Sequence, residues 1–197
     1  MKSEKGNLFI ISGPSGVGKT ILAAKLRENN IVRKNISHTT RKPRSDEIDG
    51  VHYFFIKPDD FNKMKTNNEF LETAIVFGNF YGTEKKWVMD KLNSGQNILL
   101  ILDVQGAMNI KKIMPESVLI FINPPCEKTL IDRLVKRGEN DGADLEERIK
   151  AAKIEMSHSH KYDRIVINQD VESAVNEIGE IIENSIINKR DDDQNEM

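Results

Sequence analysis

The chain has 197 residues, a length that predicts one domain, or one domain with lobes grown out of it. Hydrophobic residues make up 38% and charged residues 30% of the sequence, which excludes long disordered, collagen-like and disulfide-rich proteins. Its 29 basic and 31 acidic side chains leave a net charge of −2, which argues against a surface wholly devoted to a nucleic-acid backbone.

The cysteine content and the hydrophobic runs indicate a cytoplasmic protein. Cys126 stands alone, so no internal disulfide forms and a reducing compartment is expected. We interpret it as an incidental small residue at a strand end, with a reactive thiol as the alternative. The first apolar run, residues 8–11, is shorter than a signal peptide core or a membrane span requires. We therefore expect no membrane and no nucleic-acid partner.

Apolar runs and helical periodicity alternate along the chain. Continuous apolar runs predict strands covered on both faces of a parallel sheet, at residues 7–12, 97–102, 118–122 and 164–168. Apolar residues three and four apart predict helices at residues 19–29, 127–137, 144–156 and 171–187. This alternation is typical of an α/β fold with right-handed crossovers.

Three segments break the pattern. Residues 37–87 are polar and rich in aromatic side chains, which predicts an inserted lobe with short strands of its own. Residues 137–148 are charged and contain two glycines, so we expect a mobile, exposed segment there. Residues 188–197 have almost no apolar side chains, and we expect that tail to be disordered.

A glycine-rich sequence follows the first predicted strand and opens the first predicted helix. It reads Gly13-Pro14-Ser15-Gly16-Val17-Gly18-Lys19-Thr20 and fits the pattern G-x-x-x-x-G-K-[ST] completely. Glycines let backbone N–H groups surround a phosphate, and the helix N-terminus adds positive potential. Lys19 would reach the β- and γ-phosphates, and the Thr20 hydroxyl would ligate Mg²⁺. We prefer a phosphate-binding loop to the alternative, a structural glycine turn.

The inserted lobe carries a second candidate phosphate site. Arg41 and Arg44 flank a proline, and two guanidinium forks held at a fixed spacing suit one dianionic phosphate. A solvated basic turn is the alternative that the spacing alone leaves open.

Beyond these two motifs, the chain resembles guanylate kinases along nearly all its length. The resemblance rests on ordered sequence blocks that are more specific than the phosphate loop alone. They are Ser37 to Arg44 with Glu47, Gly50 and Tyr53; Asn68 to Glu72; Tyr81-Gly82-Thr83; Asp103 to Ala107; Arg133-Leu134, Arg137-Gly138 and Glu147-Arg148; and Glu155 to His158, Tyr162-Asp163 and Val166 to Asn168.

The resemblance implies an architecture and a reaction. The architecture is a phosphate-loop core with a parallel sheet flanked by helices, built from residues 1–36, 89–125 and 151–187. A GMP-binding lobe at 37–88 and a lid at 126–150 are inserted into it. The reaction is ATP-dependent phosphorylation of GMP, and of dGMP, to GDP with Mg²⁺. The alternatives are a non-catalytic, guanylate-kinase-like protein-binding module and a related kinase for another phosphorylated acceptor. Whether the protein is a monomer or a homo-oligomer stays open.

The resemblance also implies residue roles. Catalytic roles fall to Lys19, Arg41, Arg133, Arg137 and Arg148; ATP binding falls to residues 13–20 and Asn168; and GMP binding falls to Ser37, Arg41, Arg44, Tyr53, Glu72, Tyr81 and Thr83. Glu72 would accept from the guanine N1–H and 2-amino groups, while Ser37 and Thr83 would donate to the O6 side. Thr20 and Asp103 would hold the metal, although Asp103 is also suited to cap the following helix.

One of the departures from the family pattern bears directly on the site. The family usually has an acidic residue two positions before the strand-end aspartate, and this chain has Ile101 there. In the family that carboxylate lies near the guanine and the phosphate-loop lysine, so Ile101 bears on both contacts.

Overall fold

The computed structural model describes residues 5–29, 32–136 and 142–195, and its centre is a parallel sheet of five strands. The sheet order is β2-β7-β1-β8-β9, and every neighbouring pair is parallel. The strands are β1 (Leu8–Ser12), β2 (Arg33–Lys34), β7 (Ile98–Ile101), β8 (Val118–Asn123) and β9 (Arg164–Ile167). The four apolar runs that predicted strands are confirmed, and β2 was not anticipated.

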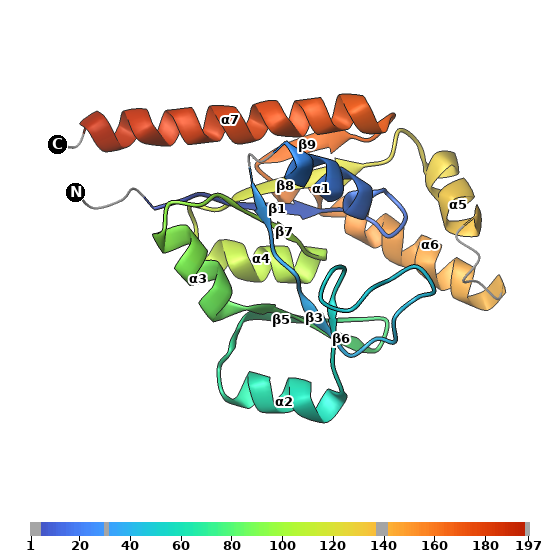
Figure 1. Cartoon of the computed structure of the whole chain (residues 1–197). Helices are drawn as coiled ribbons and strands as arrows, with labels where there is room; N and C mark the ends of the chain where they lie inside the picture. Colours follow the sequence, from blue (N-terminus) through green and yellow to red (C-terminus); the bar gives the residue numbers. More distant parts are fainter. Residues whose placement is uncertain (1–4, 30–31, 137–141, 196–197) are drawn as a thin grey trace.

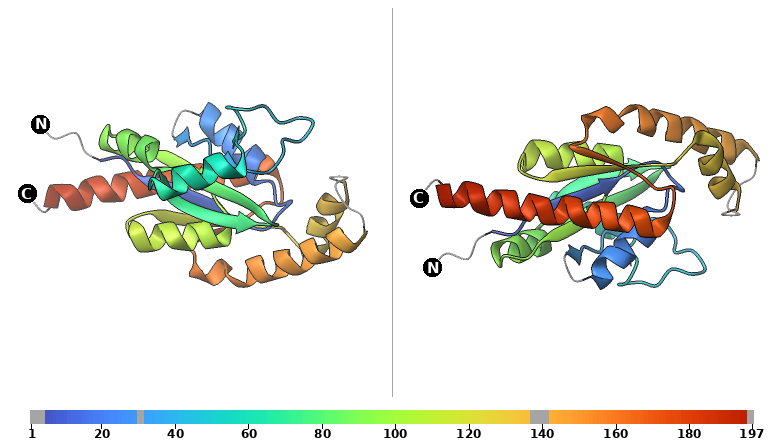
Figure 2. Two further views of the ribbon diagram at one scale, coloured as in Figure 1. Left: turned by 90° about the horizontal axis from the view of Figure 1, so that it is seen from below. Right: turned by 90° about the horizontal axis from the view of Figure 1, so that it is seen from above.

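Helices cover both faces of this sheet, as Figures 1 and 2 show. α1 (Lys19–Glu28) and α7 (Val171–Asn195) pack on one face, whereas α3 (Lys85–Asn93) and α4 (Val104–Ile113) pack on the other. Successive side chains of β1 enter the two cores alternately, because strand residues point to opposite faces. This double burial explains why the strands have continuous apolar sequences, and it confirms the predicted α/β class.

The inserted segment forms a second sheet of its own, below the core in Figure 1. Its order is β4-β3-β6-β5, formed by β3 (His38–Thr39), β4 (Phe54–Phe55), β5 (Phe70–Val76) and β6 (Asn79–Glu84). α2 (Pro58–Thr66) packs on this sheet through Phe61, which is fully buried. The Phe61 ring stacks on Phe70 and Phe80, with centroids 4.6 and 5.4 Å away, and so forms a small separate core.

Two helices occupy the region between β8 and β9. α5 (Glu127–Lys136) and α6 (Gly142–Ser157) are followed by the short 3-10 helix η1 (Ser159–Lys161). The helix predicted at 144–156 is confirmed and begins two residues earlier, at Gly142; of the segment 137–148 that we expected to be mobile and exposed, residues 146 and 147 are exposed, and 137–141 lie outside the described residues. Leu145 and Ile149 pack against the core, and this apolar spacing outweighed the charged composition.

The C-terminal helix is longer than predicted. We expected disorder from residue 188, but α7 continues to Asn195. Adding residues to an existing helix costs far less than nucleating one, so a polar extension follows a well-packed helix. None of the helices in the described part of the chain is long and apolar enough to span a membrane.

The aromatic stack gives a first testable prediction. Replacing Phe61 by Ala removes the buried ring and leaves a cavity, so we expect a loss of about 3–5 kcal/mol in the free energy of unfolding. Ile75→Thr is the matched control, because Ile75 is 60% exposed on β5 and threonine keeps the β-branch; its cost is expected to stay within ~0.5 kcal/mol. Urea denaturation compares the two variants, and equal costs would contradict a separate core in the inserted lobe.

Candidate active site

A cleft of about 1220 Å³ lies where the carboxyl ends of the core strands face the inserted lobe. Open α/β sheets place their ligands at this edge. Predicted site residues from separate parts of the chain meet along it. They are Gly13, Ser15, Gly16, Gly18, Lys19, Thr20, Ser37, Arg41, Arg44, Tyr53, Glu72, Tyr81, Asp103, Arg133 and Arg148.

Four of the predicted site residues that the structure describes do not line this cleft. Pro14, Val17, Thr83 and Asn168 are buried. Arg137 lies outside the described residues. The motifs and the family resemblance therefore located the cleft, but they did not separate residues that face it from residues that support it.

The glycine-rich loop has the backbone shape that its glycines permit. Gly16 and Gly18 have φ angles of 81° and 102°, which side chains with a Cβ rarely adopt. Gly18 is also the N-cap of α1, so the loop runs directly into the helix N-terminus. The Lys19 ammonium donates to the carbonyls of Gly13 and Pro14, at 2.5 and 3.0 Å. The loop thus places a cation beside backbone amides, an arrangement that suits a polyphosphate.

Two side chains from distant elements hold the loop in place. Asn168, which we predicted to contact ATP, donates from Nδ2 to the Val17 carbonyl at 2.7 Å. Arg133 of α5 donates to the carbonyls of Val17 and Asn168, both at 3.3 Å. A Cβ at Gly18 would lie 2.7 Å from Asn168 Nδ2, so the third loop glycine also makes room for this support.

Two carboxylates lie on the same side of the cleft as Lys19. Asp103 caps α4 by accepting from the N–H groups of Gly106 and Gln105, at 3.1 and 3.3 Å, while it also lines the cleft. Burial raises the pKa of Asp103, although these N–H groups and the Lys19 charge act in the opposite direction.

Glu155 of α6 is a cleft residue to which sequence analysis assigned no role. Burial raises its pKa, whereas the Lys19 charge and the N–H of Ser15 favour its ionised form. An acidic residue on the inward, apolar face of a helix, next to Met156, was the signal that could have identified it.

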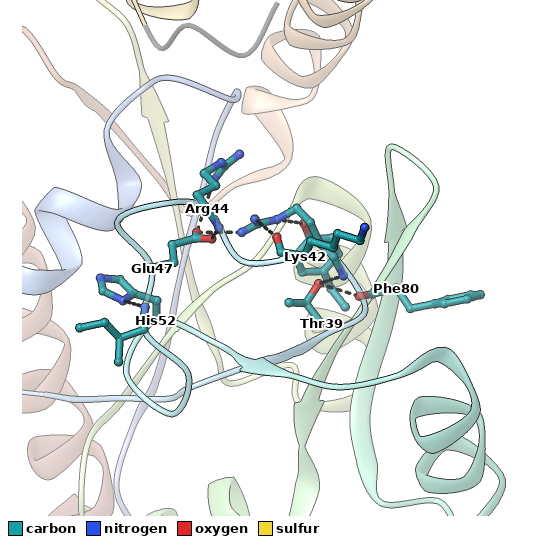
Figure 3. Close-up of polar contacts among 9 residues, drawn as sticks. Thr39, Lys42, Arg44, Glu47, His52 and Phe80 are labelled. Carbon is teal, nitrogen blue, oxygen red and sulfur yellow. Dashed lines mark hydrogen bonds and ion pairs between the residues drawn. The ribbon is translucent and has the colours of Figure 1, made fainter.

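The two arginines of the lobe are held in place by Glu47. Its Oε1 accepts from Arg41 at 2.8 Å and pairs with Arg44 at 3.5 Å, and its Oε2 accepts from the Arg44 backbone N–H at 2.8 Å. Figure 3 shows the carboxylate of Glu47 directed at Arg44. Burial acts to raise the pKa of Glu47, but the hydrogen bonds from Arg41 and from the Arg44 backbone, together with the two arginine charges, outweigh it and leave this pKa below the ordinary value. The arginines therefore form a braced pair, not a solvated basic turn.

Two tyrosines complete this part of the cleft. Arg41 Nε donates to the Tyr81 hydroxyl at 3.2 Å, and its guanidinium lies 5.6 Å from the Tyr53 ring centroid. The rings of Tyr53 and Tyr81 meet edge to face at 5.9 Å. Guanidinium groups and phenol hydroxyls thus converge on one wall, and these are donors that fit a phosphate.

Glu72 is the buried acid of the cleft, with an exposed fraction of 6%. Its Oε1 accepts from the Thr83 hydroxyl at 2.8 Å, and its Oε2 has no hydrogen-bond partner within the described structure. Burial raises the pKa of Glu72 to about 7, helped by the charge of Asp103 and opposed by Thr83. The Thr83 hydroxyl thus donates to Glu72 in this structure and supports the acid from the neighbouring strand.

α6 and the inserted lobe also meet across the cleft. The Arg148 guanidinium of α6 lies 5.1 Å from the ring centroid of Phe77, at the turn of the β5–β6 hairpin. Ile101 lines the same cleft and packs partly against the core on the α1 face. An apolar surface thus stands where an acidic residue was expected from the family pattern.

Comparisons with known proteins identify the family of this chain. The guanylate kinase family model matches residues 5–185. The guanylate kinase of Clostridioides difficile is 44% identical over 180 residues, which cover 91% of this chain and 88% of that protein. The enzyme of Carboxydothermus hydrogenoformans gives the same identity and the same coverage.

A solved structure shows the same fold. The crystal structure of guanylate kinase from Anaplasma phagocytophilum has a TM-score of 0.79 against this chain, at 35% sequence identity. The match covers 93% of this chain and 87% of that one. With its phosphate loop, braced arginine pair and buried acid in one cleft, the chain belongs to the guanylate kinase family of enzymes.

Proposed function

We propose that the protein transfers a phosphoryl group from ATP to GMP, as the family does, and so yields ADP and GDP. One wall of the cleft binds ATP and the other binds GMP. The observation that carries this division is the placement of Lys19 and Arg41 in one cleft, on separate elements of core and lobe. The core wall binds the triphosphate through loop amides and Lys19. The lobe wall binds the acceptor phosphate through Arg41, Arg44 and the two tyrosines.

The acceptor base is recognised by Glu72. An ionised carboxylate accepts from the N1–H and 2-amino groups of guanine, whereas adenine presents no such pair of donors on that edge. A buried acid facing adenine would stay unpaired, and this penalty rejects AMP. The partnerless Oε2 of Glu72 supports the assignment, because it retains the capacity to accept.

A magnesium ion fits the oxygen donors on the core side. Within the described residues, no group of three or more His, Cys, Asp or Glu side chains could hold a metal ion. Mg²⁺ is usually bound by one or two protein oxygens together with substrate phosphates and water, so the Thr20 hydroxyl and the Asp103 carboxylate suffice. When bound there, the ion neutralises charge on the phosphate oxygens.

The remaining catalysis is positioning and charge stabilisation. The acceptor is already an ionised phosphate, so no strong general base is needed. Lys19 stabilises charge that grows on the leaving phosphate, while Arg133 keeps the loop in shape through its two backbone contacts. Closure of lid and lobe excludes water, which would otherwise hydrolyse ATP.

The assignment of Lys19 is tested by Lys19→Ala. We expect a loss of ~3–4 kcal/mol in transition-state stabilisation, or about 10²–10³-fold in kcat, with unchanged thermal stability. Lys25→Ala is the matched control, because Lys25 is a lysine of the same helix that pairs with Glu172 away from the cleft. A kcat for Lys19→Ala within about threefold of the parent enzyme would exclude this role.

The acceptor wall is tested by Arg41→Ala. Loss of a charged donor is expected to raise KM for GMP by roughly 10–100-fold, while KM for ATP changes little. Lys42→Ala removes an exposed positive charge from the neighbouring residue and serves as the control. If KM for ATP rose more than KM for GMP, the two walls would have been assigned in reverse.

Base selection is tested by Glu72→Gln. The amide still accepts from Thr83, but it cannot accept from both guanine donors. We therefore expect kcat/KM for GMP to fall by a factor that corresponds to a loss of about 2–4 kcal/mol in transition-state stabilisation. ADP production is measured with GMP, dGMP, AMP and no acceptor. An unchanged preference for GMP over AMP in the variant would show that another residue reads the base.

A further inference from the structure

Gly106 is a glycine that its own backbone does not require. It is the third residue of α4 and is buried, and it is not among the glycines of the described chain that have a positive φ. Alanine is the better helix former at such a position. The reason for a glycine must therefore lie in the space around it.

That space is filled by two carboxylates. A Cβ at residue 106 would lie 2.8 Å from Glu72 Oε2, 3.4 Å from Glu72 Cδ and 3.1 Å from Asp103 Oδ1. Neither carboxylate can withdraw easily, because Thr83 holds Glu72 through Oε1 and Asp103 is held by its cap of α4. A glycine at residue 106 thus allows the Glu72 carboxylate to pack directly against the backbone of the first turn of α4.

The Glu72 carboxylate lies beside the start of α4 without a hydrogen bond to it. The N–H groups of Gln105 and Gly106 donate to Asp103, and Glu72 Oε2 has no hydrogen-bond partner within the described structure. A side chain at residue 106 would push the carboxylate away from that turn and displace it in the cleft.

We propose that Gly106 is a positioning residue that sets guanine specificity, by keeping the Glu72 carboxylate seated against the first turn of α4. The inference rests on the proposed role of Glu72 as the base reader. Because Gly106 has no side chain, the Glu72 carboxylate can align with the edge of the purine.

The test is Gly106→Ala, assayed with both substrates. KM for GMP is expected to rise about tenfold or more and the preference for GMP over AMP to fall, whereas KM for ATP stays within about twofold. Gly179→Ala is the matched control, because Gly179 is also helical and nothing lies within 4 Å of its added Cβ. That control is expected to leave all three quantities unchanged.

A double-mutant cycle separates this contact from a general packing defect. Gly106→Ala is expected to lower the Tm of the parent enzyme by roughly 4 °C or more, but not that of Glu72→Ala, in which the collision with Glu72 is gone. Equal Tm losses in the two backgrounds, or a KM for ATP that rises as much as KM for GMP, would overturn the proposal. If Glu72→Ala itself left the GMP preference intact, the proposed role of Glu72 would fail instead.

Discussion

The buried Glu72 carboxylate lies where the inserted lobe packs against the core, and its burial constrains both. The residue lies on β5 of the inserted lobe, yet its Oε2 lies against Gly106 at the start of α4, which belongs to the core. The acid that we propose as the reader of the base is therefore in contact with the core. Asp103, the acid proposed to hold the metal, caps the same turn of α4.

The ionised Glu72 carboxylate lowers the free energy of unfolding, although it is the form proposed to bind guanine. Burial raises the pKa of Glu72 from the ordinary 4.5 to about 7 in the folded chain. Well below pH 4.5 the group is protonated in both states and folding bears no cost. Between pH 4.5 and 7 the unfolded chain loses this proton while the folded chain keeps it, so stability falls progressively, by about 3 kcal/mol in all, and above pH 7 the folded state holds a desolvated charge. In the proposed complex, the two donors of guanine would compensate the charge that the fold leaves without a partner, and the binding energy would depend on the base that supplies them.

Local patterns predicted much of the fold and the place of the site. Continuous apolar runs marked four core strands, and the glycine-rich motif located the phosphate loop, because both signals depend on neighbouring residues. The short β2 and the extension of α7 left no such signal, since tertiary packing and helix propagation produce them. The supporting contacts were also beyond prediction. Asn168 and Arg133 reach the loop from residues more than one hundred positions away, and Thr83 faces Glu72 only through the pairing of β5 and β6.

The central claim is that Glu72 is held desolvated until guanine supplies its partners. The most direct test is a carbon-13 NMR titration of the glutamate carboxyl groups, with Glu72 assigned by comparison with Glu72→Gln. The account predicts a pKa near 7 for Glu72 in the free enzyme, and a fall of at least about one unit when GMP is bound. A free-enzyme pKa near 4.5, or one that GMP does not move, would contradict it.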